Sequence, residues 1–170
     1  MTKRARPAGA PRAQPEPRDS AEAERRLAEF IDKFEPGTAA LIRECRAELR
    51  KILPTAFELV YDNYNFFVIG YSATEKPSDC IVSLAAAANG VGLSFYRGAD
   101  VADPERLLLG SGKQNRFIRL PDAGLLRSRP VLALIQSAID VSRAPLQATG
   151  DGHVVVRSVS GKQRPRRSRE

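Results

Sequence analysis

Two short segments carry side chains of the kinds that bind ligands. The first, Gly110-Ser-Gly-Lys113 with Arg116 close behind, partly matches a phosphate-binding loop. That loop needs a glycine five positions before Gly112 and a Ser or Thr after the lysine, but Leu107 and Gln114 occupy those positions. We therefore do not expect a nucleotide hydrolase. The glycine amides with Lys113 and Arg116 could hold an anion weakly, and an ordinary turn is the simpler interpretation.

The second segment, Tyr61-Asp62-Asn63-Tyr64-Asn65, is dense in hydrogen-bonding side chains. We expect Asp62 and Asn63 at the tip of a two-residue hairpin turn, with Tyr61 and Tyr64 side by side behind it. Asp and Asn also tolerate the dihedral angles of turns. The pattern therefore supports either the polar rim of a binding pocket or a plain turn.

Catalytic and metal-binding side chains are sparse. His153 is the single histidine and lies near the C-terminus, so the central part of the chain has no His-based relay. Carboxylates alone can hold ferrous iron loosely, and Glu44 and Glu48 lie one helical turn apart among basic residues, which is also typical of a solvated helix face. We assign no catalytic residue and no metal ligand, and the sequence favours a non-enzymatic protein.

The net charge of +7 lies in the two ends of the chain. Residues 1–19 hold five basic and two acidic residues, residues 145–170 hold six and two, and residues 20–144 hold 16 of each. The composition of both ends predicts disordered basic tails around one central domain. Nucleic acid is expected to bind only through these tails, without sequence preference, because they offer no aromatic ring to a base.

The elements that must position these side chains follow from hydrophobic spacing and turn residues. Asp19 or Ser20 can cap a first helix, and Pro36-Gly37 is expected to end it. The further expected elements are a helix over 38–53, strands over 57–61 and 64–71, a hairpin around Asn89-Gly90, a short helix over 103–109, a strand over 117–120 and a helix over 130–143. This order predicts an α+β fold: a mainly antiparallel sheet with two N-terminal helices and one C-terminal helix packed against it.

The hairpin around Asn89-Gly90 sorts its residues into two faces. An Asn-Gly turn would pair Ala86 with Leu93 and Leu84 with Phe95. One face then carries large apolar side chains, and the other carries Ser83, Ala85, Ala87, Gly92 and Ser94. Small residues on a sheet face allow either a closely packed helix or a ligand, and we expect the helix.

Residues 21–142 resemble the YdhG-like domain family of small bacterial domains without a known function. The similar segments are Glu58–Asn65, Ser83-Leu84, Leu93–Ala99, Asp103-Pro104, Leu107-Leu108, Gly110–Lys113 with Arg116, and Ala133–Ile135. The resemblance implies a compact α+β fold in a cytoplasmic protein, and iron delivery has been suggested within the family. Our candidate binding residues are the polar positions that also match the family motif: Tyr61, Asp62, Asn65, Lys113 and Arg116, with the last two facing an anion.

Together these observations predict a non-enzymatic module that binds a small ligand or a protein partner. The alternatives are iron binding through surface carboxylates and nonspecific nucleic-acid association through the basic tails. Two isolated cysteines suit a reducing cytoplasm. No apolar run approaches the ~20 residues of a membrane-spanning helix.

Overall fold

The computed structural model describes residues 21–169, so the expected N-terminal tail and the cap of the first helix lie outside it. The first two helices form as predicted: α1 (Ala21–Ile31) and α2 (Pro36–Ile52). The expected end of the first helix at Pro36-Gly37 is wrong, because α1 ends at Ile31 and Pro36 opens the first turn of α2. Its fixed φ and missing amide hydrogen suit that position. Pro54 lies just beyond the end of α2, where its ring prevents continuation.

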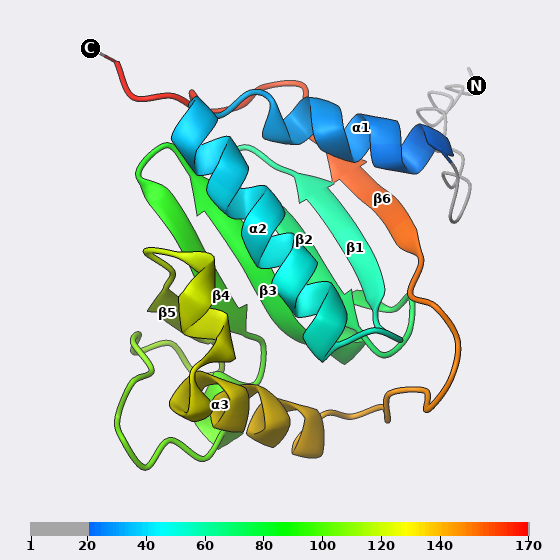
Figure 1. Ribbon diagram of the computed structural model, residues 1–170, viewed down its shortest axis with the longest axis vertical. Helices are drawn as coiled ribbons and strands as arrows, with labels where there is room; N and C mark the ends of the chain where they lie inside the picture. Colours follow the sequence, from blue (N-terminus) through cyan, green and yellow to red (C-terminus); the bar gives the residue numbers. More distant parts are fainter. Residues whose placement is uncertain (1–20, 170) are drawn as a thin grey trace, which may run out of the picture.

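A six-stranded sheet forms the second layer, in the order β5-β4-β3-β2-β1-β6 (Figure 1). Its strands are β1 (Phe57–Asp62), β2 (Phe67–Ser72), β3 (Cys80–Ala87), β4 (Gly90–Phe95), β5 (Arg116–Arg119) and β6 (Val154–Val159). All neighbouring pairs are antiparallel except β6, which runs parallel to β1. A third helix, α3 (Arg129–Asp140), completes the predicted α+β architecture. Short 3-10 turns are η1 (Pro77–Asp79), η2 (Gly98–Asp100) and η3 (Ala123–Arg127).

The core lies between the helices and one face of the sheet. The predicted apolar face of the β3–β4 hairpin is confirmed: its side chains are buried in this core, namely Val82, Leu84, Ala86, Val91, Leu93 and Phe95. The predicted pairing is wrong by two residues, because Ala86 pairs with Val91 and the turn is Ala88-Asn89. A shift of two residues leaves every side chain on its expected face.

The β1–β2 hairpin also has a longer turn than expected. The strands pair Tyr61 with Val68 and Asp62 with Phe67, so residues 63–66 form a four-residue connection. Its ends are joined by the amide of Asn63, which donates to the carbonyl oxygen of Phe66 at 3.0 Å. The two-residue turn at Asp62-Asn63 is therefore a wrong prediction, since Asp62 is the last residue of the strand.

Residues 154–159 correct the expected disorder of the C-terminal tail. They form β6, which extends the sheet along the outer edge of β1. Val154 and Val156 are buried in the core. The segment that follows stays on the fold, because the amides of Ser160 and Arg164 donate to the carbonyl oxygens of Asp62 and Tyr64, both at 2.9 Å. The folded region thus continues to residue 166 rather than ending near 144.

Residues 103–109 form a loop where a short helix was expected. The Asp103 carboxylate accepts hydrogen bonds from the amides of Leu107 and Leu108, each at 2.9 Å. Arg106 has a positive φ of 55°. A right-handed helix cannot pass through that left-handed conformation, so the capping aspartate closes a loop instead.

Within residues 21–169, no helix combines the length and the hydropathy needed to cross a bilayer.

Candidate functional site

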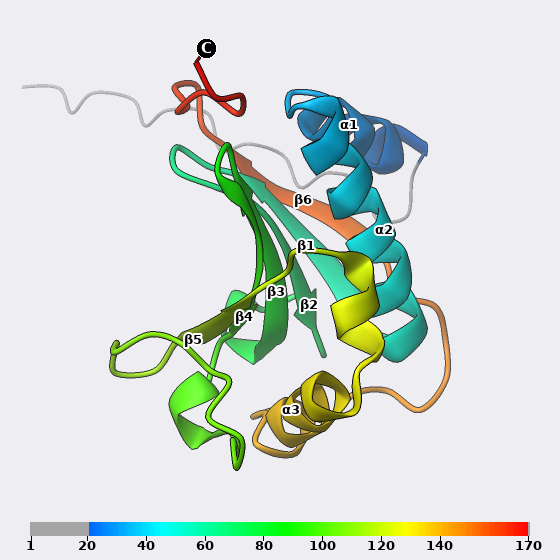
Figure 2. The ribbon, with the colours of Figure 1, turned by 60° about the vertical axis from the view of Figure 1, so that its left-hand side comes forward.

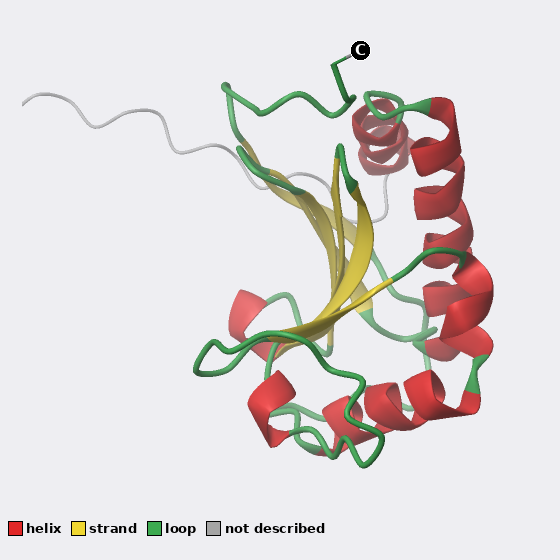
Figure 3. Cartoon of the chain, turned by 90° about the vertical axis from the view of Figure 1, so that its left-hand side faces the viewer, coloured by secondary structure: helices red, strands yellow, loops and turns green. Residues whose placement is uncertain are grey.

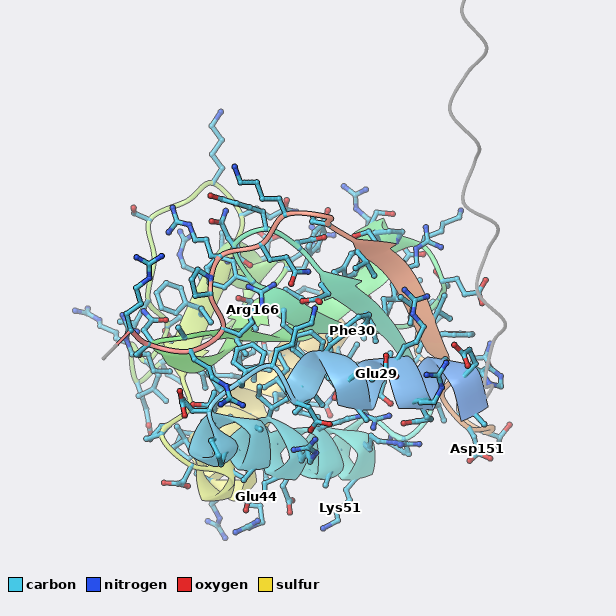
Figure 4. The ribbon with its side chains drawn as sticks, turned by 90° about the horizontal axis from the view of Figure 1, so that it is seen from above. Glu29, Phe30, Glu44, Lys51, Asp151 and Arg166 are labelled. Carbon is cyan, nitrogen blue, oxygen red and sulfur yellow. The ribbon has the colours of Figure 1, made fainter. Side chains whose placement is uncertain are left out.

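Asp62 is buried, and both of its carboxylate oxygens are engaged by cations. The Lys33 Nζ lies 2.5 Å from one oxygen and the Arg166 Nη2 lies 2.9 Å from the other. Arg166 also donates to the carbonyl oxygen of Asn63, and its guanidinium is 5.9 Å from the centroid of the Phe34 ring. Figure 4 shows Arg166 reaching inward from the C-terminal segment. Asp62 therefore fastens this segment to the sheet instead of facing a ligand from a turn tip.

Asn65 and Tyr61 lie near Asp62 but face other surroundings. Asn65 is exposed in the 63–66 turn. Tyr61 precedes Asp62 in β1, so its side chain points to the opposite face of the sheet, where it is half-buried. Burial raises the pKa of Tyr61, and the nearby guanidinium of Arg157 partly offsets that rise. The Tyr61 hydroxyl therefore stays protonated at neutral pH and can donate a hydrogen bond.

Lys113 and Arg116 lie at the other end of the sheet. Arg116 pairs with Phe95, and the same row of partners ends on β1 at Glu58, four residues before Asp62. Four strand spacings of ~4.8 Å and four residues of ~3.3 Å put Arg116 about 23 Å from Asp62. The five predicted binding residues therefore do not converge on one cleft.

Arg116 organises its own loop. Its Nη1 donates to the carbonyl oxygens of Gly112 and Asn115, at 2.5 and 2.8 Å. Lys113 is exposed at the tip of that loop. Of this predicted anion-binding pair, only Lys113 presents an unobstructed cation to solvent.

The second face of the sheet has no α-helix over it among the described residues (Figures 2 and 3). The predicted small residues do lie on this face, and Ser83, Ala85, Gly92 and Ser94 remain half-buried. Within residues 21–169 no α-helix covers them as expected, since α1, α2 and α3 all pack on the face that carries the large apolar side chains. We call this surface the helix-free face.

An arginine accompanies an aromatic ring on the helix-free face at each side of the sheet. On β5, the Arg119 guanidinium lies 5.9 Å from the centroid of the Phe117 ring. On the other side, β6 pairs Val156 with Val60 and Ser158 with Tyr61, so Arg157 lies next to Tyr61 of β1. Arg119 is opposite Gly92, and Tyr61 is opposite Val68, so small and medium side chains fill the distance between the two pairs. Four strand spacings separate β5 from β1, which corresponds to ~19 Å.

The charged residues at both edges of the helix-free face are basic. Residues 110–120 include three basic and no acidic residues. Residues 154–169 include six basic and no acidic residues; two of the six, Arg166 and Arg167, contact Asp62 and the Lys33 carbonyl oxygen on the helical side. The strands between them carry two carboxylates, Glu58 and Asp62, and both pair with cations of the helical layer or of the C-terminal segment. The helix-free face of β1 to β4 is therefore uncharged between two basic edges.

Glu58 belongs to a closed network in the core. Arg46 donates to both of its oxygens, at 2.9 and 3.0 Å, and to both oxygens of Glu24, at 3.0 and 2.8 Å. The hydroxyl of Tyr71 donates to Glu58 at 3.2 Å. Burial and the neighbouring carboxylate raise the pKa of Tyr71 well above its ordinary value. These groups satisfy one another and hold α1 and α2 on the sheet.

A hollow of about 440 Å³ between α2 and η3 gathers three carboxylates, those of Glu44, Glu48 and Asp122. Glu48 is bound by Lys51 at 3.2 Å and by Arg127 at 3.0 Å. Figure 4 shows Glu44 and Lys51 on the outer side of α2. Residues 21–169 contain no group of three or more His, Cys, Asp or Glu side chains arranged to hold a metal ion. The iron alternative therefore finds no assembled site in this part of the chain.

The two cysteines are not arranged as nucleophiles. The Cys80 Sγ lies 3.3 Å from the Ser83 hydroxyl, and a side chain at Gly70 would come within 3.1 Å of that sulfur. Burial raises the pKa of Cys80, and burial raises the pKa of Cys45 to about 11. Both sulfurs are therefore protonated thiols at neutral pH, which are poor nucleophiles.

Three arginines with a role in this region were not among the predicted site residues: Arg119 and Arg157 on the helix-free face, and Arg166, which is buried against Asp62. Arg157 and Arg166 were counted as parts of a disordered tail. The run Val154-Val155-Val156 is the sequence signal that could have revealed β6, because β-branched residues favour strands.

The chain matches no known family model, no curated protein and no solved structure. Membership of the YdhG-like domain family therefore remains a prediction.

Proposed function

We propose that this protein is a non-enzymatic binding module that holds an anionic ligand on its helix-free face. The observation that carries the proposal is the placement of charge: basic residues at both edges of that face and no carboxylate of the sheet turned toward it. An anion approaching this side meets attraction from both edges without an opposing charge between them. The absence of a nucleophile or base relay among the described residues also favours binding over catalysis.

Inorganic polyphosphate is a suitable first probe, because it offers negative charge and nothing else. We expect titration of the isotope-labelled protein to shift the NMR signals of the amides of Ser83, Gly92 and Ser94. Shifts confined to the helical layer, or no shifts, would contradict the proposal.

A charge-matched pair of variants tests the surface directly. Ala85→Glu puts a carboxylate on the half-buried floor of the helix-free face, whereas Ala40→Glu puts one on the exposed side of α2. We expect the Ala85 variant to lose polyphosphate binding and the Ala40 variant to keep it. Equal affinities in the two folded variants would exclude the helix-free face as the binding surface.

A further inference from the structure

We infer that the anionic ligand is a single-stranded nucleic acid that crosses the helix-free face from β6 to β5. This inference rests on the proposed function and names the ligand class of the same surface.

The first argument is the distance between the cations. Arg119 lies on β5, while Arg157 lies on β6, so the two are five strands apart, or ~24 Å. Lys113 and Lys162 extend the basic edges and are both exposed. A small anion cannot contact cations at that separation, whereas a polymer of phosphates can contact both edges at once. Spread cations therefore favour a polyanion over a small molecule.

The second argument is the aromatic rings beside those cations. Phe117 and Tyr61 are half-buried on the face, so part of each ring is available to a stacking base. In the neighbouring 63–66 turn, Tyr64 and Phe66 are 44% and 50% exposed, and the Arg164 guanidinium lies 5.8 Å from the centroid of the Tyr64 ring. Proteins that bind single strands combine aromatic platforms of this kind with a basic path for the backbone.

The rings of Phe117 and Tyr61 also distinguish nucleic acid from other polyanions as the ligand. An acidic peptide or polyphosphate can pair with the arginines but gains nothing from the rings. A duplex offers phosphates but keeps the faces of its bases stacked inside, out of reach of Phe117 and Tyr61. The pairing of arginine with an aromatic ring at each side of the sheet therefore favours unpaired bases.

The face has room for several nucleotides. The row of partners that begins at Phe117 on β5 ends on β1 at Leu59, two residues before Tyr61. The two rings are therefore ~20 Å apart, which equals about six nucleotides at the ~3.4 Å spacing of a stacked strand. A fluorescent oligothymidylate of about twelve nucleotides covers this path and resembles the site sizes of other sheet-based binders. Its fluorescence anisotropy, measured with the full chain at several salt concentrations, reports the affinity.

We expect the oligothymidylate to bind more tightly than polyphosphate of equal charge, and more tightly than a duplex of equal length. Phe117→Leu and Tyr61→Leu keep apolar bulk but remove the ring, so each should weaken oligothymidylate binding about tenfold and leave polyphosphate binding unchanged. A ring variant that weakens both ligands equally, or neither, would overturn the stacking argument.

The arginines are tested by salt dependence. Arg119→Ala and Arg157→Ala should each reduce the slope of log affinity against log salt by about 0.7. Lys51→Ala removes the same charge from the outer side of α2 and should leave the slope unchanged. Slopes that fall equally in all three variants would mean that net charge, and not this face, attracts the strand.

The outcomes distinguish the inference from the function on which it rests. Binding of polyphosphate to the helix-free face without a preference for the oligothymidylate would refute nucleic acid as the ligand and keep the anion-binding function. Failure of both probes to bind that face would refute both.

Discussion

Replacing Arg46 by alanine measures how far the buried carboxylate of Glu58 depends on its partner. The Glu58 side chain is 3% exposed and loses two hydrogen bonds from Arg46 in this variant. Removing one partner of a buried ion pair destabilises a protein by about 3–5 kcal/mol. The Tyr71 hydroxyl at 3.2 Å and the Arg50 Nε at 3.6 Å remain close to Glu58. We therefore expect the lower end of that range, a loss of about 3 kcal/mol in the free energy of unfolding.

Arg50→Ala is the matched control for this change. Arg50 lies on the same helix and faces the same two carboxylates, but its contacts are 3.6 and 3.7 Å and its side chain is 50% exposed. Exposed pairs contribute about 0–1 kcal/mol, so this variant should lose at most that amount. Urea denaturation of the two variants gives the comparison. If Arg46→Ala were no less stable than Arg50→Ala, Glu58 would not need the ion pair and the reasoning would be wrong.

The same network predicts that the free energy of unfolding depends on pH through the ionisation of Glu24. The hydrogen bond from Arg46 lowers the pKa of Glu24 below its ordinary 4.5, against an opposing effect of burial. A carboxyl whose pKa is lower in the folded state stabilises the fold above the pKa of the unfolded state. That stabilisation is lost as the pH falls below about 4.5 toward the folded-state pKa. Glu24→Gln should therefore flatten the acid side of the stability profile, and a profile identical to that of the native protein would contradict the assignment.

Three further predictions follow from the packing. Arg166→Ala leaves Lys33 as the remaining cation beside the buried Asp62 carboxylate. Amide hydrogen exchange of residues 160–166 should therefore become faster, while β3 stays protected. Unchanged exchange would mean that Arg166 does not hold this segment on the sheet. Gly98→Ala would put a methyl group 2.5 Å from the Cβ of Arg116 and should lower the free energy of unfolding by about 1–3 kcal/mol, whereas Gly37→Ala, with open space around it, should not. Cys45, buried and with its pKa raised to about 11, should react with a thiol reagent only after unfolding, and labelling of the native protein at Cys45 would refute that burial.

The faces of the sheet were predictable from the sequence, but the register was not. Alternation along β3 and β4 assigns Leu84 and Leu93 to the core whichever way the turn is drawn, because a shift by two residues preserves the side of the sheet. Register depends on which residues form the turn. Gly90 does adopt a positive φ of 139°, yet it pairs with Ala87 as a strand residue.

The candidate site was predictable only in part, because its basic side depends on a long-range contact. Tyr61 was selected from a polar segment, and it does lie on the helix-free face. Its partner Arg157 is 96 residues away in the sequence, in a region whose composition predicted disorder. Local composition cannot report that Asp62 will pair with Arg166 and draw this region onto the sheet.

The parallel pairing of β6 with β1 sets the order in which the sheet can be completed during synthesis. The chain emerges from its N-terminus, so β1 to β4 can pair as neighbours soon after residue 95 is made. The outer edge of β1 then stays unpaired until Val159 has followed. An open strand edge is a template for pairing with other chains. In nascent chains of intermediate length the open edge is therefore that of β1. In the complete sheet the open edge is that of β6, which carries Arg157, and charged side chains on an edge oppose pairing with other chains.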